Sequence, residues 1–212
     1  MDIIFTQISE YLQQGDDEKV FKLTKNAIKL NLNPKDILDN GLIAGMNIIG
    51  EQFRKHEIFL PDVLMAAKAM YAGLDQLKPL LASKGISGLG KVVIGTVQGD
   101  LHDIGKNLVG IMLKGAGFDV IDLGKDVSAE KFVETAKREN AKLIGMSALL
   151  TTTMQTMKKV TELLKKENSE IKTIIGGAPV SKEFANEIGA NAYAYDVANA
   201  VECVKNLISG VK

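Results

Sequence analysis

The apolar residues of this chain change their spacing near residue 83, and that change constrains the fold more than any other feature of the sequence. Before it they recur every three or four residues, as at Val63, Ala67 and Met70, which is the spacing of an amphipathic helix. After it they form short β-branched runs that alternate with helical stretches. The sequence therefore predicts a helical domain over residues 1–83 and an α/β domain over residues 91–212.

Start signals divide the helical domain into four predicted helices. Asp16 and Asn33 stand where helix caps are expected, and Pro61 opens the last segment as a first-turn proline. The third helix contains Gly41 and Gly45. Because an interior glycine costs ~1 kcal/mol relative to alanine, we expect these glycines to allow close packing against another helix.

The run SKGISGLGK is small and rich in glycine, which predicts a linker over residues 84–90. Five β-branched runs follow it, namely VVIGTV, FDVIDLG, KLIGMSA, IKTIIGG and a weak NAYAY. The stretches between them are long enough for right-handed helical crossovers between parallel strands. We expect a doubly wound, flavodoxin-like sheet of five parallel strands, which binds its ligand beyond the carboxyl ends of the strands.

Charge and hydropathy exclude several classes of partner. Lys+Arg and Asp+Glu both number 26, so there is no net positive charge to favour nucleic acid. No apolar run approaches the ~20 residues that span a bilayer, and the amino terminus lacks the features of a secretory leader. We expect a cytoplasmic protein that binds neither nucleic acid nor membrane. The single cysteine, Cys203, lies among apolar residues and is expected in the core.

Asp100 and His102 lie in a loop between Gly99 and Gly105, where the imidazole is exposed above the sheet edge. A histidine that binds a metal through one ring nitrogen usually donates its other N–H to a carboxylate. Asp100 is a candidate for that carboxylate, and the spacing leaves Asp103 open as well. Alternatively, the two aspartates only cap the following helix and the histidine is a solvated loop residue. The residue types alone do not decide between these readings.

Other kinds of site are disfavoured. A catalytic zinc needs three protein ligands, and the only other histidine, His56, lies in the helical domain. Neither phosphate-binding motif, G-x-x-x-x-G-K-[ST] or G-x-G-x-x-G, is present. A switch domain that is phosphorylated on a carboxylate would need an aspartate at the end of the third strand of this topology, and Ser147 stands there instead.

Hydroxyls and glycines follow the third and fourth strands. Ser147 and Thr151 to Thr153 either donate to a ligand or to Asp100, or they cap a helix. Gly176 and Gly177 either let the backbone approach a ligand closely or form a tight turn.

The segments GTVQGDLHDIGKN, MSALLTTTM, IIGGAPVS and GANAYAYD resemble the cobalamin-binding domain of methionine synthase and of the small corrinoid proteins of methylamine and methanol methyltransferase systems. The segments GLIAGMNIIGEQF and EIFLPDVLMAAKAM resemble the four-helix cap domain that precedes it in those proteins. The D-x-H-x-x-G core of the family corresponds to Asp100, His102 and Gly105.

This resemblance implies that the chain binds cobalamin or a related corrinoid in the base-off, His-on form. The nucleotide tail of the cofactor leaves the cobalt and enters the α/β domain, and His102 takes the lower axial position. Asp100 tunes His102 by a hydrogen bond, with a hydroxyl near Thr153 as its own partner. The other implied cofactor contacts are Asp103, Gly105, Ser147, Leu149, Thr151, Gly176, Gly177, Tyr193 and Phe59, the last covering the upper, methyl-bearing face.

The function that the resemblance implies is methyl transfer by a corrinoid subunit that is not catalytic alone. A substrate-specific methyltransferase methylates cobalt(I), and a second methyltransferase moves the methyl group to coenzyme M or a tetrahydrofolate-type acceptor. A reductive activation protein is the third implied partner. Two alternatives are a corrinoid-dependent sensor and a subunit of an adenosylcobalamin mutase, and an adenosyl form of the cofactor would favour either of them. The methyl donor is not encoded in any residue singled out above.

Overall fold

The computed structural model describes residues 2–83 and 88–209. Contacts within the chain divide it into two compact units that meet in sequence near residue 87. Residues 84–87 of the predicted linker lie outside the described residues. Among the helices that are described, none combines the length and the apolar character that crossing a membrane requires.

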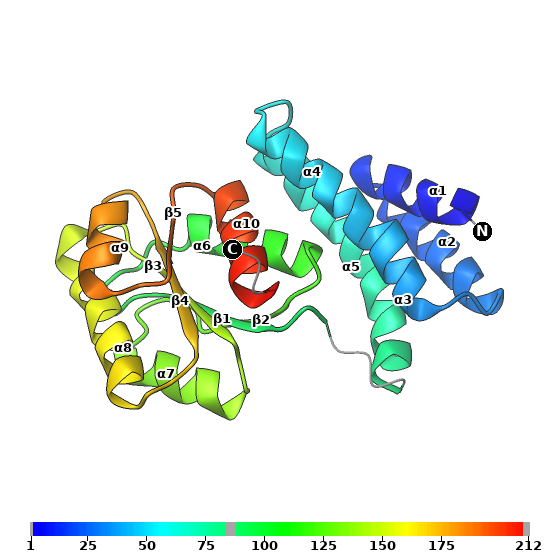
Figure 1. Cartoon of the computed structure of the whole chain (residues 1–212). Helices are drawn as coiled ribbons and strands as arrows, with labels where there is room; N and C mark the ends of the chain where they lie inside the picture. The colour runs from blue at the N-terminus through cyan, green and yellow to red at the C-terminus, as the bar shows by residue number, and fades with distance from the viewer. Residues whose placement is uncertain (1, 84–87, 210–212) are drawn as a thin grey trace. The chain divides into compact units, whose positions relative to one another are not determined.

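The helical unit contains four helical segments within residues 2–83, as the start signals predict (Figure 1). They are α1 (Asp2–Gln13), α2 (Asp17–Lys29), a continuous stretch from Pro34 to Arg54, and α5 (Leu60–Ser83). The predicted caps are confirmed, because the side chains of Asp16 and Asn33 accept hydrogen bonds from the amides of Lys19 and Lys35, each at 3.0 Å. Each cap satisfies an amide that the first helical turn leaves without a partner.

The third helical stretch has a π-helical middle that the sequence pattern does not indicate. It consists of α3 (Pro34–Asp36), the π-helix η1 (Ile37–Ile43) and α4 (Ala44–Arg54). Its glycines pack against α1. A Cβ atom on Gly41 would lie 3.0 Å from Cγ2 of Ile8, and one on Gly45 would lie 3.1 Å from the carbonyl oxygen of Ser9. The predicted close approach of two helices is confirmed.

The second unit is built on a five-stranded sheet within residues 88–209. The strands are β1 (Lys91–Thr96), β2 (Asp119–Asp122), β3 (Leu143–Ser147), β4 (Lys172–Gly176) and β5 (Ala192–Ala194). Their order is β2-β1-β3-β4-β5, and every neighbouring pair is parallel. This order confirms the doubly wound, flavodoxin-like fold, in which the winding reverses between β1 and β3.

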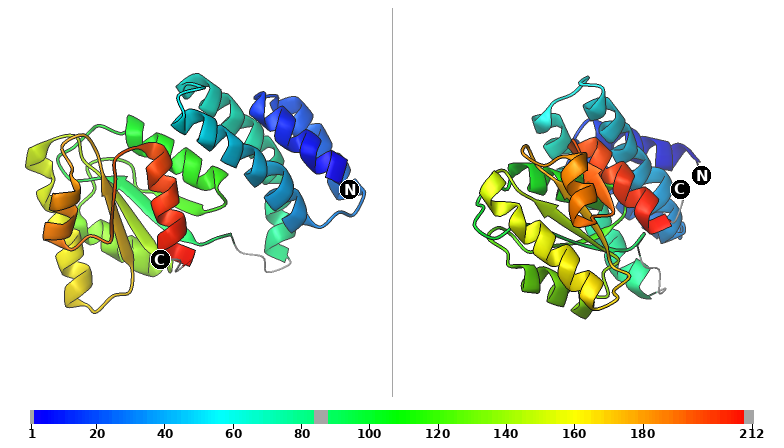
Figure 2. Two further views of the ribbon diagram at one scale, coloured as in Figure 1. Left: turned by 45° about the horizontal axis from the view of Figure 1, so that its top comes forward. Right: turned by 60° about the vertical axis from the view of Figure 1, so that its left-hand side comes forward.

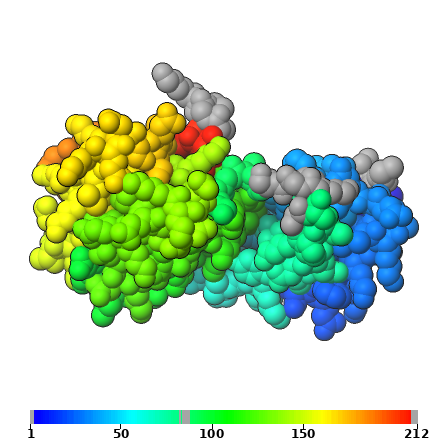
Figure 3. Space-filling view, turned by 90° about the horizontal axis from the view of Figure 1, so that it is seen from below, coloured from blue at the N-terminus to red at the C-terminus, as the bar shows by residue number. Residues whose placement is uncertain are grey.

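Helices cover both faces of this sheet (Figure 2). One face carries α6 (Ile104–Gly115) and α10 (Val197–Ser209). The other carries α7 (Ala129–Arg138), α8 (Gln155–Lys166) and α9 (Lys182–Ile188), and Figure 3 shows the surface of the unit over α7 and α8. Phe132, Met157 and Ile144 are fully buried in the core beneath these three helices. Apolar burial of this kind stabilises the sheet and fixes the loops at its edge.

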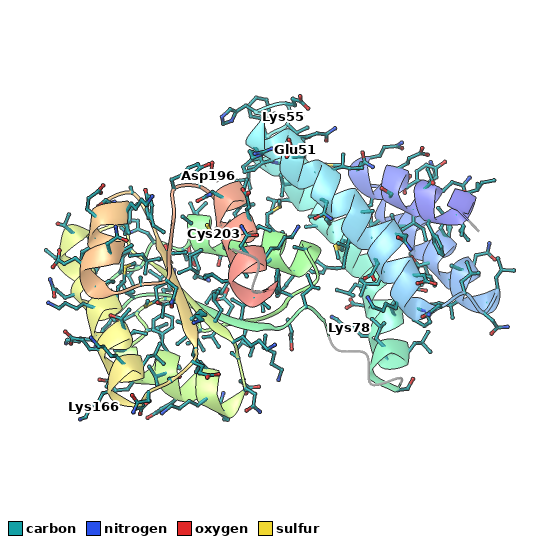
Figure 4. All side chains as sticks on the ribbon, in the orientation of Figure 1. Glu51, Lys55, Lys78, Lys166, Asp196 and Cys203 are labelled. Carbon is teal, nitrogen blue, oxygen red and sulfur yellow. The ribbon has the colours of Figure 1, made fainter. Side chains whose placement is uncertain are left out.

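The prediction that Cys203 belongs to the core is wrong. It lies on α10, where Figure 4 labels it, and it is only partly buried. Burial, with a smaller contribution from the neighbouring Glu202 carboxylate, still raises the pKa of the Cys203 thiol. The apolar residues of α10 that do enter the core are Ala200, Val201 and Val204.

Candidate functional site

The predicted site residues of the α/β unit lie largely in loops at one edge of the sheet. The first loop follows β1 and carries residues 97–103, and the second follows β3 and leads through the short 3-10 helix η2 (Thr151–Thr153) into α8. Because β1 and β3 are parallel neighbours, their carboxyl ends meet at the same edge, where the winding of the sheet reverses. The fold therefore brings these two loops together.

The Asp100 carboxylate is completely buried where the two loops meet. Its Oδ1 atom accepts hydrogen bonds from the backbone amide of His102 at 3.0 Å and contacts the Nδ1 atom of the same residue at 2.7 Å. Its Oδ2 atom accepts from the amides of Leu149 and Leu150 at 2.7 and 3.1 Å, and from the Thr153 hydroxyl at 3.1 Å. Asp100 thus links the β1 loop to the β3 loop.

These contacts keep Asp100 ionised. Burial by itself raises the pKa of a carboxyl group, but hydrogen bonds from the His102 and Leu149 amides, the His102 ring and the Thr153 hydroxyl outweigh that effect. Together they hold the pKa of Asp100 well below its usual range. The site consequently contains a fixed negative charge next to an imidazole.

The His102 ring is about half exposed, with 54% of the side chain accessible. Because Nδ1 faces the Asp100 carboxylate, a neutral ring carries its proton on Nδ1 and presents the lone pair of Nε2 outwards. The backbone of the same residue is held as well, since its carbonyl accepts a hydrogen bond from the buried Thr96 hydroxyl at 3.0 Å. This arrangement suits binding of a metal ion through Nε2.

The structure decides the choice between the two aspartates. Asp100 contacts the imidazole, whereas the carboxylate of Asp103 lies 3.8 Å from Nζ of Lys125. The helix-capping interpretation of Asp100 is wrong, because its carboxylate accepts hydrogen bonds from residues of the two loops, His102, Leu149, Leu150 and Thr153.

The hydroxyl that reaches Asp100 is that of Thr153, which is buried. Thr151 is exposed at the start of η2, and Ser147 ends β3 and lines a cavity. Leu149 contributes its backbone amide to Asp100. The hydroxyl-rich turn therefore supplies one hydroxyl to the carboxylate, that of Thr153, together with backbone amides.

A cavity of about 400 Å³ opens on the sheet face that α6 and α10 cover. Five of the predicted cofactor contacts line this cavity, namely Gly105, Ser147, Gly176, Gly177 and Tyr193.

The interior of this cavity is largely apolar. Val92, Leu113 and Val204 line it and are themselves buried. Its outer rim includes Asp196 at the start of α10, labelled in Figure 4. An apolar cleft with a few polar groups at its rim is the usual form of a small-molecule site.

Glycine stands at two of the predicted site positions for different reasons. Gly177 has φ +125°, and a Cβ atom there would lie 1.9 Å from the carbonyl oxygen of Ala148, so packing of the chain against itself requires glycine. At Gly105 a Cβ atom would meet nothing within 4 Å and would enter open space beside the cavity. The chain's own packing therefore explains Gly177 but not Gly105.

Comparison with known proteins agrees with this geometry. Two family models, each described as a B12 binding domain, match residues 90–202 and residues 4–78. A dimethylamine corrinoid protein of Methanosarcina barkeri is 49% identical over 85% of this chain and 86% of its own length. A corrinoid protein of Desulfitobacterium hafniense is 42% identical over 97% of both chains. This chain belongs to the corrinoid protein family.

The likeness extends to the fold of the whole corrinoid protein. A crystal structure of the methanol:cobalamin methyltransferase complex from Methanosarcina barkeri superimposes with a TM-score of 0.91 at 31% identity. The match covers 100% of this chain and 82% of that one.

The residues at the sheet edge fit a corrinoid. Large apolar side chains are exposed beside His102 in sequence, at Leu101 and Ile104, and in the loop after β3, at Leu149 and Leu150. Exposed apolar side chains at the edge of a sheet suit contact with the broad face of a macrocycle. The half-exposed imidazole supplies a nitrogen ligand, and the cavity with its open space at Gly105 supplies room for an extended substituent.

Phe59 belongs to the helical unit of the corrinoid protein, in the turn before α5, and 70% of it is exposed. Its amide donates a hydrogen bond to the Asp62 carboxylate at 2.8 Å, which fixes the start of α5. The structure does not relate this residue to the α/β site, so its covering role stays a prediction.

Sequence reasoning missed a buried charge at the cavity. Lys106 lines the cavity with a buried side chain, and its Nζ lies 2.6 and 2.5 Å from the two oxygens of Asp122 and 2.6 Å from Oδ1 of Asn107. A buried lysine needs such partners. Its position one residue after Gly105 was the available signal, but its partner Asp122 is the last residue of β2 and shares no motif with it.

Proposed function

We propose that this corrinoid protein carries a methyl group on the cobalt of a corrinoid, with His102 as the lower axial ligand. The observation that carries the proposal is the His102 ring held at 2.7 Å by a buried, ionised carboxylate at the switch point of the sheet. The family of corrinoid proteins and the names of the two relatives support the same reading.

The cofactor is bound base-off and His-on in this proposal. The cavity beneath α6 and α10 takes the nucleotide tail, in contact with Ser147, Gly176 and Tyr193, which line it. Gly105 leaves space for the tail at the mouth, and the exposed leucines support the corrin ring. When bound, the corrinoid supplies a cobalt centre that takes up and gives up methyl groups.

Asp100 would orient and tune the ring of His102. With a metal held at Nε2, Nδ1 would donate a hydrogen bond to Oδ1 of Asp100, which would raise the basicity of the ligand. Thr153 and the Leu149 and Leu150 amides keep the carboxylate charged throughout.

The partners are two methyltransferases and a reductive activation protein. The solved structure of a methanol:cobalamin methyltransferase complex, which this chain resembles, supports a substrate-specific methyltransferase as the donor-side partner. The second methyltransferase passes the methyl group to coenzyme M or a tetrahydrofolate-type acceptor. The helical unit acts as a cap, in which Phe59 covers the upper face of the cofactor and moves aside for each partner. All of these steps take place in the cytoplasm.

Reconstitution tests the proposal. The chain, refolded with hydroxocobalamin and desalted, is expected to retain a coloured cofactor in about equimolar amount. In the methylated form, His102→Ala is expected to keep the fold and lose the spectrum of nitrogen-ligated cobalt. A wild-type protein that stays colourless would contradict corrinoid binding. Identical spectra for wild type and His102→Ala would contradict the assignment of His102.

A further inference from the structure

The segment from the last residue of β2 onwards, residues 122–127, is bonded to the loop that carries His102. Before the loop begins, the amide of Thr96 donates a hydrogen bond to the carbonyl of Gly124 at 2.9 Å, and the amide of Val127 donates to the carbonyl of Thr96 at 3.0 Å. These bonds extend the contact between β1 and β2 past the ends of the strands. The segment is therefore a fixed neighbour of the loop.

Within this segment Asp126 holds the residues just before His102 from two sides. Its Oδ1 atom accepts a hydrogen bond from the amide of Gly99 at 2.8 Å, and its own amide donates to the carbonyl of Asp100 at 3.2 Å. Asp126 has φ +57°, in the left-handed region that aspartate and asparagine enter more readily than other residues with a Cβ atom. One bond is made by the side chain of Asp126, and the other is made by its backbone amide.

The same segment also holds the chain after His102. Asp122 binds the buried Lys106 in the first turn of α6, and its Oδ1 atom accepts a further bond from the amide of Gly124 at 2.9 Å. The histidine thus lies between two fixed points, Asp100 and Lys106. The β3 loop fixes the Asp100 side chain that orients the His102 ring, whereas residues 122–127 fix the backbone of Gly99 and Asp100 before His102 and the side chain of Lys106 after it.

We propose that Asp126 is a positioning residue for the axial ligand, which sets the path of the backbone through Gly99 and Asp100 so that the His102 ring meets the metal. The inference rests on the proposed function. Functional groups must be held within about 0.5 Å of their productive geometry. Asp100 holds the ring and the amide of His102, and Asp126 holds the backbone of Gly99 and of Asp100 itself. An exposed aspartate with no role beyond closing a surface loop would leave ligation unchanged when replaced.

Three variants separate the bond from the backbone conformation. Asp126→Asn keeps an oxygen acceptor and tolerates the left-handed conformation, whereas Asp126→Gly keeps the conformation and loses the acceptor. Asn140→Gly is the matched control, because Asn140 is also exposed, has φ +53° and precedes the amino end of β3, away from the site. Each protein is reconstituted with methylcobalamin, and the ratio of nitrogen-ligated to unligated cofactor is read from the absorption spectrum.

We expect Asp126→Gly to lower that ratio by roughly fivefold to tenfold, the factor that one hydrogen bond contributes. Asp126→Asn and Asn140→Gly are expected to match wild type. A wild-type ratio in Asp126→Gly would overturn the inference, and if that variant fails to fold, a wild-type ratio in Asp126→Glu, whose acceptor is displaced by one methylene, would overturn it equally. A different result would contradict the proposed function itself, namely identical absorption spectra for wild type and His102→Ala.

Discussion

Oδ1 of Asp100 lies 2.7 Å from Nδ1 of His102, and Oδ2 of the same carboxylate accepts hydrogen bonds from the loop after β3. One buried side chain thus orients the imidazole and joins two loops of the sheet edge. Because hydrogen bonds to an ionised group are stronger than those between neutral groups, loss of the charge affects both the ring and the loop junction.

The pH dependence of folding follows from this carboxylate. Its pKa is depressed in the folded protein, so the stability it contributes is complete above the unfolded value of about 3.9 and is lost as pH falls below it. We expect the free energy of unfolding of wild type to fall more steeply below about pH 4 than that of Asp100→Asn. Urea unfolding from pH 7 to pH 3 measures the difference. Parallel curves for the two proteins would show that Asp100 is not held ionised by its partners.

The Thr153 hydroxyl is expected to contribute through Asp100. Thr153→Val keeps the shape of the side chain and removes the contacts of its hydroxyl with Oδ2 of Asp100 and with the carbonyl of Leu150. We expect the free energy of unfolding to fall by about 1–2 kcal/mol at neutral pH. Thr152→Val, at the exposed neighbouring position, is the control and is expected to be nearly neutral. Equal losses in both variants would assign the effect to η2 and not to the carboxylate.

The two glycines separate packing from cofactor binding. Gly177→Ala places Cβ against the carbonyl oxygen of Ala148 and is expected to lower the free energy of unfolding by about 3 kcal/mol. Gly105→Ala meets nothing in the chain and is expected to fold at least as stably as wild type, yet to retain less cobalamin after desalting. Thermal unfolding and absorbance measure the two effects. Full retention of cobalamin by a folded Gly105→Ala would place the tail elsewhere.

Replacing Phe59 tests the cap. With Phe59→Ala we expect reduced cobalt(I) to be oxidised several-fold faster, because the variant loses the exposed aromatic ring that we propose as the cover of the cofactor. Phe21→Ala, which removes another exposed aromatic of the helical unit, is the control and should leave the rate unchanged. Decay is followed by absorbance under a fixed oxidant concentration. The same lifetime in both variants and wild type would remove the covering role.

The architecture was predictable because the two periodicities are local. Each signal in the sequence depends on only a few neighbouring residues: the helical spacing of apolar residues, the caps Asp16 and Asn33, and the five β-branched runs. Together these signals predict the helices, the parallel strands and the edge of the sheet where ligands bind. The π-helical turn at Ile37–Ile43 was not predictable, because its apolar residues also satisfy an ordinary helical stripe.

The site was predictable as a location but not as a set of contacts. Asp100 and Asp103 are both near His102 in sequence, and only the path of the loop brings Asp100 to the imidazole. Gly177 was expected either to let the backbone approach a ligand or to form a tight turn, and the group that approaches it closely is the backbone of Ala148. Asp126 lies 26 residues after Asp100 and reaches the loop only through the pairing of β1 with β2, so no motif joins them.

The central claim is that a nitrogen of His102 binds the cobalt, and electron paramagnetic resonance of the bound cobalt(II) form tests it most directly. A single axial ¹⁴N nucleus splits the cobalt lines into triplets, and an axial ¹⁵N nucleus splits them into doublets. Protein grown with ¹⁵N-histidine and loaded with unlabelled cobalamin is expected to show doublets. Triplets in that sample would mean that the axial nitrogen belongs to the cofactor's own base, and they would contradict the account.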